Sequence, residues 1–350
     1  MDINSVIAAN YSENEFPACM DQTRRWSVNR PLEGLTVLDV TPIFRNTLVK
    51  HRALIAAGAR LIVGRSSMIP CDEKIVRLLS DNGIRVVDSS EGQAGEVDFV
   101  MDCAGAFNHW KPKVGYVELT KSGVSRYEGC DRPVFVADSG RIKKIETSFG
   151  TGESYFRAMK QLGYSLPAES KIVIFGSGKV GTGLLAYASR NGLKPTVVTM
   201  PETVNGTTRS LADEIVDCNE IERVAAVVAD AFAVVTATGV AGALSHPVLV
   251  EALEKSGAVI ANMGVEDEFG PGMPAERVLE GKKPLNFILE EPTHLKYIDA
   301  TMALHNEGAI HLLEHPEAEG LIDPPAEMEE KLLNITCERG VIGDEIREYI

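Results

Sequence analysis

The chain lacks the features that tie proteins to membranes or to nucleic acids. No apolar run approaches the roughly 18 to 20 residues that a membrane-spanning helix needs. Lys and Arg total 35 against 50 Asp and Glu, which gives a formal net charge of −15. The densest basic clusters are pairs, such as Lys282 with Lys283, so a polyanion would meet a net repulsion. We therefore expect no membrane partner and no nucleic-acid partner.

The patterns of metal ligands and of structural disulfides are also missing. The six cysteines include no CxxC pair, and the seven histidines form no HExxH motif. The N-terminal segment carries acids where a signal peptide would carry bases. These absences predict reduced thiols, a cytoplasmic location and no metal ion.

What the chain does contain is an alternation of short apolar segments with segments of helical period. Strands are predicted at 35–40, 60–64, 84–88, 97–102, 134–138, 171–176, 195–200, 233–238 and 258–263. Helices are predicted at 48–59, 72–83, 152–163, 179–192, near 209–216, at 246–257 and at 297–315. Such βαβ alternation is typical of parallel sheets covered by helices. The fold class is therefore predicted as α/β, with two doubly wound units.

The length of 350 residues is ample for two domains. The alternation breaks near 149–151, so we place one domain at 1–150 and a second at 151–295. A long helix is predicted after the second series. We place 296–330 with the first domain as well, and 331–350 is left as a C-terminal tail.

A glycine-rich loop stands at the start of the second series. Gly176–Gly181, with the sequence GSGKVG, matches GxGxxG between a predicted strand and a predicted helix, which is the context that dinucleotide binding requires. Gly176 would allow the tight turn, Gly178 would let the backbone approach a pyrophosphate, and Gly181 would permit close contact of helix and strand. The amide groups at the start of the helix would then hold the phosphates. The alternative is a glycine turn without a ligand.

The residue that usually follows the second strand of such a unit is an acid that binds the ribose hydroxyls. Here that position is Met200, followed by Pro201 and Glu202, so Glu202 would have to serve through a shifted turn. No basic residue follows the strand before Arg209, and a 2′-phosphate would lack a counter-charge. NAD is therefore favoured over NADP.

Several blocks of the sequence, in order, resemble the S-adenosylhomocysteine hydrolase family. VADSGRIKKIETSFGTGES (136–154) is similar to the family's block that links its two domains, and KIVIFGSGKVGTG to its dinucleotide loop. VVTATG (234–239) and AVIANMG (258–264) resemble its third and fourth cofactor-domain strands. LNFILEEPTHLKYIDATM (285–302) resembles the stretch that returns the chain to the substrate domain. The resemblance runs from about Leu35 to His315.

The resemblance implies a substrate domain followed by a Rossmann domain, tightly held NAD and a homo-oligomer, either a dimer or a tetramer. The family's enzymes oxidise a ribose 3′-hydroxyl, eliminate and add at the activated sugar, and then reduce the ketone. The candidate cofactor contacts, from the loop and the resemblance together, are Thr120, Lys121, Ser122, Thr147, Gly176, Ser177, Gly178, Lys179, Val180, Gly181, Thr182, Met200, Glu202, Asn205, Thr238, Asn262, Met263, Gly264 and Asn286.

The family's chemistry positions are largely altered. Its first motif reads Pro42, Phe44 and Asn46 here, and its oxidising lysine falls at Ile142, beside two lysines. Hydroxyl oxidation needs a base or a proton relay, and a nearby cation stabilises the developing oxyanion. The candidate catalytic residues are Asp102, Glu118, Lys143, Lys144, Glu146 and His294. The plainer alternatives are a helix cap for Asp102 and a solvated linker face for the lysines and Glu146.

These departures argue against ordinary adenosylhomocysteine hydrolysis. We expect an NAD-dependent oxidoreductase that oxidises, reduces or epimerises a hydroxyl of a nucleoside or a sugar-like small molecule, held in a cleft between the two domains. A hydrolase with rearranged catalytic residues and a non-catalytic NAD-binding regulator stay open as alternatives.

Overall fold

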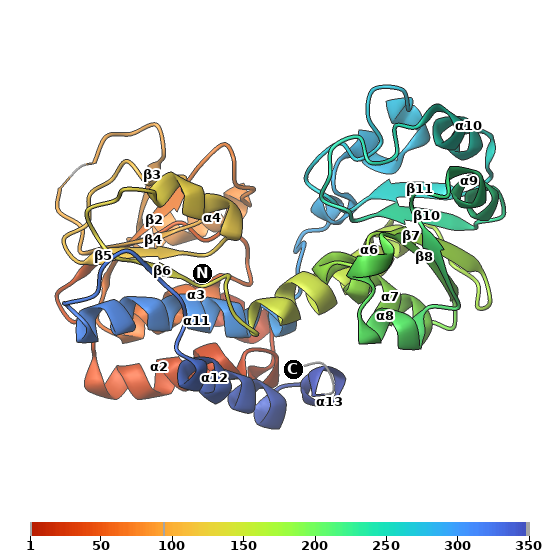
Figure 1. Ribbon diagram of the computed structural model, residues 1–350. Coiled ribbons are helices and arrows are strands. Elements are labelled where there is room, and N and C mark those ends of the chain that lie inside the picture. Colours follow the sequence, from red (N-terminus) through yellow and green to blue (C-terminus); the bar gives the residue numbers. More distant parts are fainter. Residues whose placement is uncertain (1, 94, 348–350) are drawn as a thin grey trace. The chain divides into compact units, whose positions relative to one another are not determined.

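The structure, a computed structural model, describes residues 2–93 and 95–347 and divides into two compact units. Unit 1 consists of Met1–Ile145 and His294–Ile350, and unit 2 of Glu146–Thr293 (Figure 1). The division falls a few residues before the predicted one. The predicted tail from 331 is not a separate segment, because Lys331 lies within a helix of unit 1.

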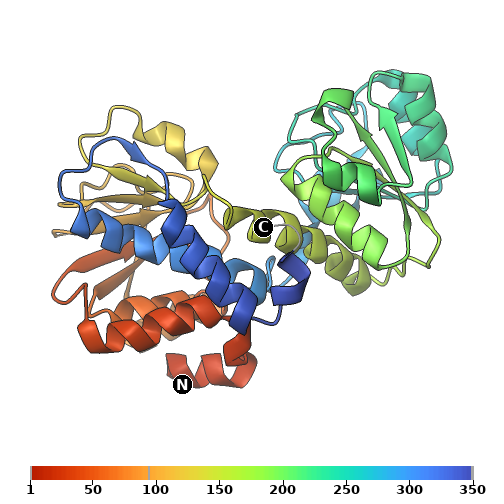
Figure 2. The same ribbon diagram turned by 60° about the horizontal axis from the view of Figure 1, so that its bottom comes forward.

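Unit 1 is built on a parallel sheet with the strand order β12-β6-β5-β4-β1-β2-β3. The strands are β1 (Thr36–Asp39), β2 (Arg60–Arg65), β3 (Arg85–Asp88), β4 (Phe99–Asp102), β5 (Gly115–Glu118), β6 (Val134–Val136) and β12 (Leu321–Ile322). The helices are α1 (Ile3–Asn10), α2 (Pro17–Asn29), α3 (Leu48–Ala56), α4 (Glu73–Asp81), α5 (Lys121–Val124), α11 (Leu295–Glu314), α12 (Ala326–Arg339) and α13 (Gly343–Ile346). Helices α3 and α11 lie against one face of the sheet, and α2 and α12 pack beyond them (Figures 1 and 2).

Unit 2 carries a second parallel sheet, with the order β11-β10-β7-β8-β9. Its strands are β7 (Lys171–Phe175), β8 (Lys194–Thr199), β9 (Glu214–Asp217), β10 (Ala233–Thr236) and β11 (Val259–Asn262). Its helices are α6 (Thr151–Gln161), α7 (Lys179–Arg190), α8 (Gly206–Leu211), α9 (Ile221–Ala229) and α10 (Pro247–Lys255). The chain reverses its direction of winding between β7 and β10, which makes this the switch point where open α/β sheets bind ligands.

Glycines let two helices of unit 2 approach closely. A Cβ atom on Gly183 of α7 would overlap the carbonyl oxygen of Ser148, and one on Gly152 of α6 would overlap the backbone of Gly183. This close approach fixes α7, whose N-terminus follows the glycine-rich loop. The sequence motif and the packing of the helix behind it are therefore coupled.

A long-range contact caps a helix of unit 1. Helix α2 begins after Phe16, whose side chain cannot accept a hydrogen bond. Instead, the carboxylate of Asp299 on α11 accepts the backbone N–H groups of Ala18 at 2.7 Å and Cys19 at 3.0 Å. The returning C-terminal segment thus completes the N-terminal helix layer, as the side chain of a local cap would.

The structure corrects two secondary-structure predictions. The predicted helix near 209–216 is wrong: α8 ends at Leu211, and Glu214–Asp217 forms the edge strand β9 beside β8. The stretch 103–148, irregular by sequence, contains the buried strand β5. Both strands have only four residues, too few to show a period, and pairing with neighbouring strands decides their state.

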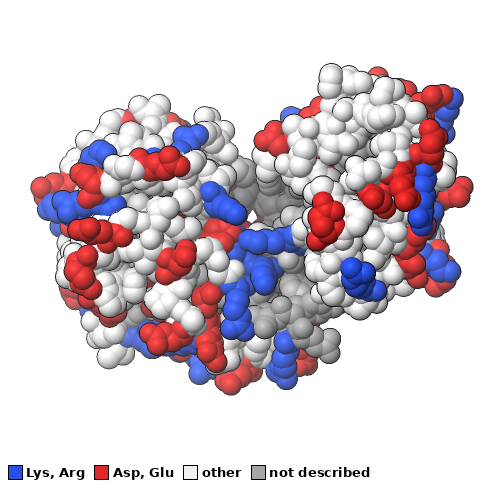
Figure 3. Space-filling view, in the orientation of Figure 1, with Lys and Arg blue, Asp and Glu red and all other residues white. Residues whose placement is uncertain are grey.

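Among the described residues, no helix is long and apolar enough to cross a membrane. On the face shown in Figure 3, acidic and basic side chains are interspersed over both units. The excess of acids is thus spread out on this face.

Candidate functional site

The glycine-rich loop of unit 2 has the geometry that its sequence predicts. Gly176 has a φ of +101°, and a Cβ there would lie 2.5 Å from the carbonyl oxygen of Ala237. A Cβ on Gly181 would overlap the carbonyl oxygen of Gly176. Gly178, the N-cap of α7, has nothing within 4 Å of its Cβ position. Two glycines are therefore required by packing, and the third faces open space where a ligand would approach.

Hydroxyl groups lie where the loop meets the end of β8. The side-chain oxygens of Ser177, Thr199 and Thr203 form a triangle with edges of 2.8 to 2.9 Å. They hold the short 3-10 turn Pro201–Thr203, which leaves Met200 and Glu202 exposed. Asn205 caps α8 by accepting the N–H of Thr208 at 2.8 Å. Glu202 is thus the acidic side chain presented at the end of β8, three residues beyond the strand.

On the other side of the switch point, the side chain of Asn262 at the end of β11 forms hydrogen bonds only with other groups of the protein. Its amide nitrogen donates to the carbonyls of Glu266 and Lys282, at 2.8 and 2.7 Å. Its oxygen accepts from the hydroxyl of Thr236 and from the N–H of Gly264, at 3.0 and 2.8 Å. These four contacts use the two donors and two lone pairs of an amide. Asn262 therefore shapes the loop around a ligand rather than offering its side chain.

Glu268 joins the loops that follow β10 and β11, and the sequence analysis missed it. Its carboxylate accepts the N–H and hydroxyl of Thr238 at 2.9 and 2.8 Å, and the N–H of Gly239 at 2.7 Å. The side chain is completely buried. No short motif includes a residue that is buried only because two loops fold over it, so the sequence held no signal for it.

The other cofactor candidates of unit 2 are spread around the same edge. Lys179 is exposed at the first turn of α7, beside half-buried Val180, and Thr182 bonds back to the carbonyl of Ser177 at 3.2 Å. Met263 and Asn286 are 6% and 8% exposed. Thr147 is half-buried in the π-helical turn Ile145–Gly150.

In unit 1, Asp102 and Glu118 stand side by side at the carboxyl ends of β4 and β5. Asp102 accepts the N–H groups of Cys103 at 2.8 Å and Phe107 at 2.9 Å, and the hydroxyl of Tyr127 at 2.5 Å. Glu118 accepts the N–H groups of Ala104 at 3.0 Å and Gly105 at 3.0 Å. The two carboxylates thus hold the loop 103–107, in which Ala104 has a φ of +56°.

Burial sets the protonation of this acidic pair. It raises the pKa of Asp102 to about 6, although hydrogen bonds from Tyr127 and the loop amides favour the charged form. Burial and then the charge of Asp102 raise the pKa of Glu118 to about 7. Neighbouring carboxylates that both titrate near neutral pH share their protons as a pair. The pair can therefore take up or release a proton near neutral pH, where ordinary carboxyl groups stay ionised.

The remaining unit 1 candidates differ in exposure. Lys143 is buried, and its ammonium group donates to the carbonyl of Leu119 at 3.2 Å, next to Glu118. Lys144 is exposed, so Lys143 is the buried one of the two lysines. His294 is the half-buried N-cap of α11.

Thr120 caps α5 and donates its hydroxyl to Glu118 at 2.7 Å, whereas Lys121 and Ser122 are exposed. Glu146 is half-buried and belongs to unit 2, unlike Lys143.

A second ionic cluster of unit 1, also missed by sequence, lies at the end of β1. Asp39 contacts the ammonium group of Lys50 at 2.7 Å and the Nε2 atom of His51 at 3.0 Å, and all three side chains are fully buried. His305 of α11 donates through Nε2 to the carbonyl of Val117 at 2.9 Å. We call Asp39, Lys50, His51 and His305 the β1 cluster.

Electrostatic effects within the β1 cluster are strong. Burial opposes ionisation of Asp39, but Lys50 and His51 outweigh it and hold the pKa of Asp39 well below its usual range. Burial and then the charge of Lys50 lower the pKa of His305 to about 3, so this imidazole is neutral. Lys143 lowers the pKa of His305 as well. The β1 cluster is therefore electrically coupled to Lys143.

Strand register places the two groups on opposite faces of the sheet. Asp39 pairs with Met101, whereas Asp102 pairs with Glu118. Paired residues of neighbouring strands point to the same face, and successive residues point to opposite faces. The β1 cluster consequently lies toward α3 and α11, and the acidic pair lies on the other face.

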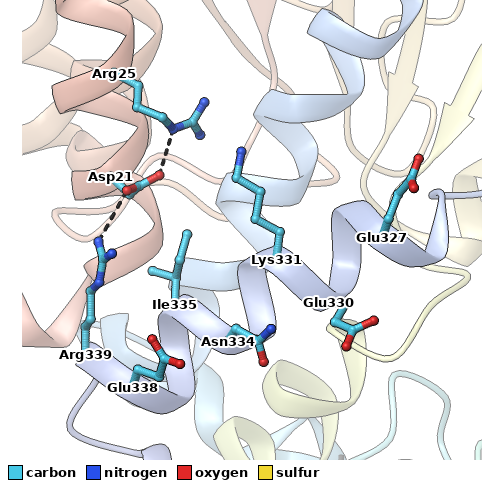
Figure 4. A pocket seen from close by; sticks show the side chains of 9 residues that line it. All are labelled: Asp21, Arg25, Glu327, Glu330, Lys331, Asn334, Ile335, Glu338 and Arg339. Atoms are coloured by element: carbon cyan, nitrogen blue, oxygen red, sulfur yellow. Dashed lines mark hydrogen bonds and ion pairs between the residues drawn. The ribbon is translucent and has the colours of Figure 1, made fainter.

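An open groove of about 580 Å³ runs between α2 and α12, on the surface of unit 1 (Figure 4). Asp21 lies on the α2 side of the groove, between Arg25 and Arg339, and contacts them at 2.7 and 3.3 Å (Figure 4). The lining has four acidic and three basic side chains, and none of them belongs to the acidic pair or the β1 cluster.

The sequence and the fold of this chain were compared with those of known proteins. No protein-family model matches the sequence. The chain is 26% identical to the adenosylhomocysteinase of Sulfolobus acidocaldarius over 281 residues, which cover 73% of this chain and 66% of that protein. It is 24% identical to the adenosylhomocysteinase of Pyrobaculum aerophilum over 336 residues, covering 81% of this chain and 74% of that protein. The chain is a divergent relative of the adenosylhomocysteinases.

This divergent relative spans just under two thirds of the length of the Sulfolobus protein. Its fold is similar to that of dipicolinate synthase, A chain, from Bacillus subtilis, with a TM-score of 0.51 and 13% identity. That similarity covers 83% of this chain and 100% of the other. The α/β fold with parallel sheets, predicted from the sequence, is confirmed.

Proposed function

We propose that this protein is an NAD-dependent oxidoreductase that acts on a hydroxyl group of a nucleoside or sugar-like small molecule. The observation that carries the proposal is the glycine-rich loop, in which Gly176 and Gly181 are required by packing and Gly178 opens to the ligand side. Relatedness to the adenosylhomocysteinases, and with it the order of the sequence blocks, indicates NAD as the cofactor.

The residues of unit 2 fit such a cofactor. Backbone amides at the start of α7 would hold the pyrophosphate, because they lack partners within the helix and carry its positive dipole end. Glu202 would accept a ribose hydroxyl, and its charge would repel a 2′-phosphate. When bound, NAD supplies a hydride acceptor.

In unit 1, we assign proton transfer to the acidic pair and charge stabilisation to Lys143. A carboxyl with a pKa near neutral can accept a hydroxyl proton and return it under the same conditions. The ammonium group of Lys143, which donates to the carbonyl of Leu119, the residue after Glu118, would stabilise an oxyanion as the proton leaves. The N–H groups of loop 103–107 donate hydrogen bonds to the carboxylates of both Asp102 and Glu118. For proton transfer to a substrate, the loop would have to release one carboxylate oxygen.

The test is a direct search for reduced cofactor. Purified protein is supplied with NAD and a panel of nucleosides and sugars, and NADH is followed by its absorbance and fluorescence. The proposal expects NADH to form with at least one hydroxylated compound, and Lys143→Met to slow its formation more than Lys144→Met. If NAD binds but no compound is oxidised, a non-catalytic NAD-binding regulator is the better account.

Hydrolysis of the kind named for the relatives is the second candidate. It would proceed through the same transient oxidation, so it shares the cofactor site. Incubation with S-adenosylhomocysteine distinguishes the two: release of adenosine and homocysteine supports hydrolysis, and oxidation without release supports an oxidoreductase. The homo-oligomer remains a prediction, to be tested by light scattering.

A further inference from the structure

We infer that Glu268 sets the preference of the nucleotide site for oxidised over reduced cofactor, an inference that rests on the proposed NAD function. The pyrophosphate belongs at the start of α7, after β7, and the adenosine ribose belongs at the end of β8. The nicotinamide half of a dinucleotide must therefore extend to the other side of the switch point, over the ends of β10 and β11. Glu268 joins the two loops at that place.

The contacts of Glu268 suit an ionised carboxylate. All three of its partners are donors, namely two backbone N–H groups and the hydroxyl of Thr238. That hydroxyl itself accepts the N–H of Val240 at 3.1 Å, so its own hydrogen is directed to Glu268. An ionised carboxylate only accepts hydrogen bonds, and this environment offers only donors.

The charge of Glu268 is not balanced by a cation. Within the described part of the chain, no Lys, Arg or His forms an ion pair with it, although its side chain is fully buried. The neighbouring Asp267 differs, because Lys282 contacts it at 3.1 Å. A buried carboxylate with only dipolar partners has a stronger field than an exposed or paired one, since neither water nor a counter-charge weakens it.

A fixed negative charge distinguishes the two states of the cofactor. The nicotinamide ring is positively charged in NAD⁺ and neutral in NADH, so a nearby carboxylate stabilises NAD⁺ alone. An enzyme that must keep the oxidised form between turnovers gains from this preference. The exposed acids of the same loop, Glu266 and Asp267, contribute less because water surrounds them.

The test compares the dissociation constants of NAD⁺ and NADH in matched variants. Glu268→Gln removes the charge and keeps the size, whereas Thr238→Val removes a contact to the carboxylate and keeps the charge. We expect the ratio Kd(NADH)/Kd(NAD⁺) to fall in Glu268→Gln by about fourfold to sixteenfold, the effect of unit charges about 10 Å apart at an effective dielectric of 20 to 40. In Thr238→Val, the dissociation constants of NAD⁺ and NADH should change by the same factor, so that their ratio stays unchanged.

Val265 provides a test that leaves the contacts of Glu268 intact. It is 86% exposed on the loop after β11, so a charged residue there is compatible with the fold. Val265→Glu should raise the ratio and Val265→Lys should lower it, each by less than the Glu268 change. These variants decide the question even if Glu268→Gln does not fold.

An unchanged ratio in Glu268→Gln, or in both Val265 variants, overturns the inference and leaves Glu268 as a loop brace alone. Tight binding of NAD⁺ and NADH with equal affinity by the unaltered protein overturns it as well, without touching the proposed function. If the unaltered protein binds neither nucleotide, the proposed function falls and the inference falls with it.

Discussion

The carboxyl edges of the two parallel sheets carry different kinds of chemical groups. At the edge of unit 2, glycines and short hydroxyl side chains leave backbone amides and open space. At the edge of unit 1, carboxylates, two lysines and two histidines are buried, and they bond to one another, to loop amides or to backbone carbonyls. The first edge is arranged to receive an anionic ligand, and the second holds charges that titrate or pair inside the protein.

The difference teaches where each edge derives its function. Unit 2 depends on backbone geometry, which a few glycines specify. Unit 1 depends on side chains from separate strands and helices, which only the finished fold brings together. Substitutions should therefore affect binding at one edge and stability or protonation at the other.

The largest expected effect is on the β1 cluster. Lys50→Met leaves Asp39 charged and buried without its ammonium partner, and should lower the free energy of unfolding by about 3 to 5 kcal/mol. Chemical denaturation measures this. The double variant Asp39→Leu with Lys50→Met removes both charges and should recover most of the loss; a double variant as unstable as the single one would show that the ion pair is not the cause.

The acidic pair of unit 1 should make stability depend on pH. Burial raises the pKa of Asp102 in the folded state to about 6, from its usual value of 3.8. Its protonated form therefore stabilises the fold fully below about pH 4, and this contribution disappears as the pH rises through 6. The loss should be about 2 kcal/mol between pH 4 and pH 8.

Asp102→Asn removes this effect together with the part of the Glu118 shift that the charge of Asp102 causes, whereas titrations away from the acidic pair occur in both proteins and cancel. The stability deficit of the Asn variant relative to the unaltered protein should shrink as the pH rises from 4 to 8. A deficit that grows with pH would mean that the ionised form of Asp102 is the favoured one.

At the edge of unit 2, Gly178→Ala should separate binding from stability. The added methyl group meets no protein atom within 4 Å, so the melting temperature should hardly change. The methyl group would intrude on the bound pyrophosphate, and the affinity for NAD should fall about tenfold, or roughly 1.4 kcal/mol. Calorimetric titration checks the affinity. Gly181→Ala is the matched contrast, because its methyl group overlaps Gly176 and should lower the melting temperature.

The smallest effect is expected at Glu202. Glu202→Gln keeps one acceptor and removes the charge, so NAD binding should weaken about threefold, since exposed charge-assisted contacts contribute little. NADP binding should improve, because its 2′-phosphate no longer meets a carboxylate. If the affinities for NAD and NADP changed by the same factor, the adenosine ribose would not lie beside Glu202.

The two edges also differ in how far the sequence predicts them. Most strands and helices follow from the apolar period, with β5 and β9 as exceptions, and the three glycine positions follow from a motif with a steric basis. Asp102 stands out by its place at the end of a predicted strand, whereas Glu118 is indicated only by the resemblance to the hydrolase family, because strand β5 is not predicted. No local sequence pattern marks the β1 cluster or Glu268. In unit 1, Asp39 and His305 come together only through long-range packing. In unit 2, Glu268 is buried only because two loops fold over it.

The central claim is that the open edge of unit 2 holds NAD. The most direct measurement is to denature the purified protein and identify any released nucleotide by mass spectrometry, after loading with an equimolar mixture of NAD and NADP and removal of the excess. The account predicts NAD in near-stoichiometric amount from the unaltered protein, and much less from Gly178→Ala. Release of neither nucleotide, or of equal amounts from both proteins, would contradict it.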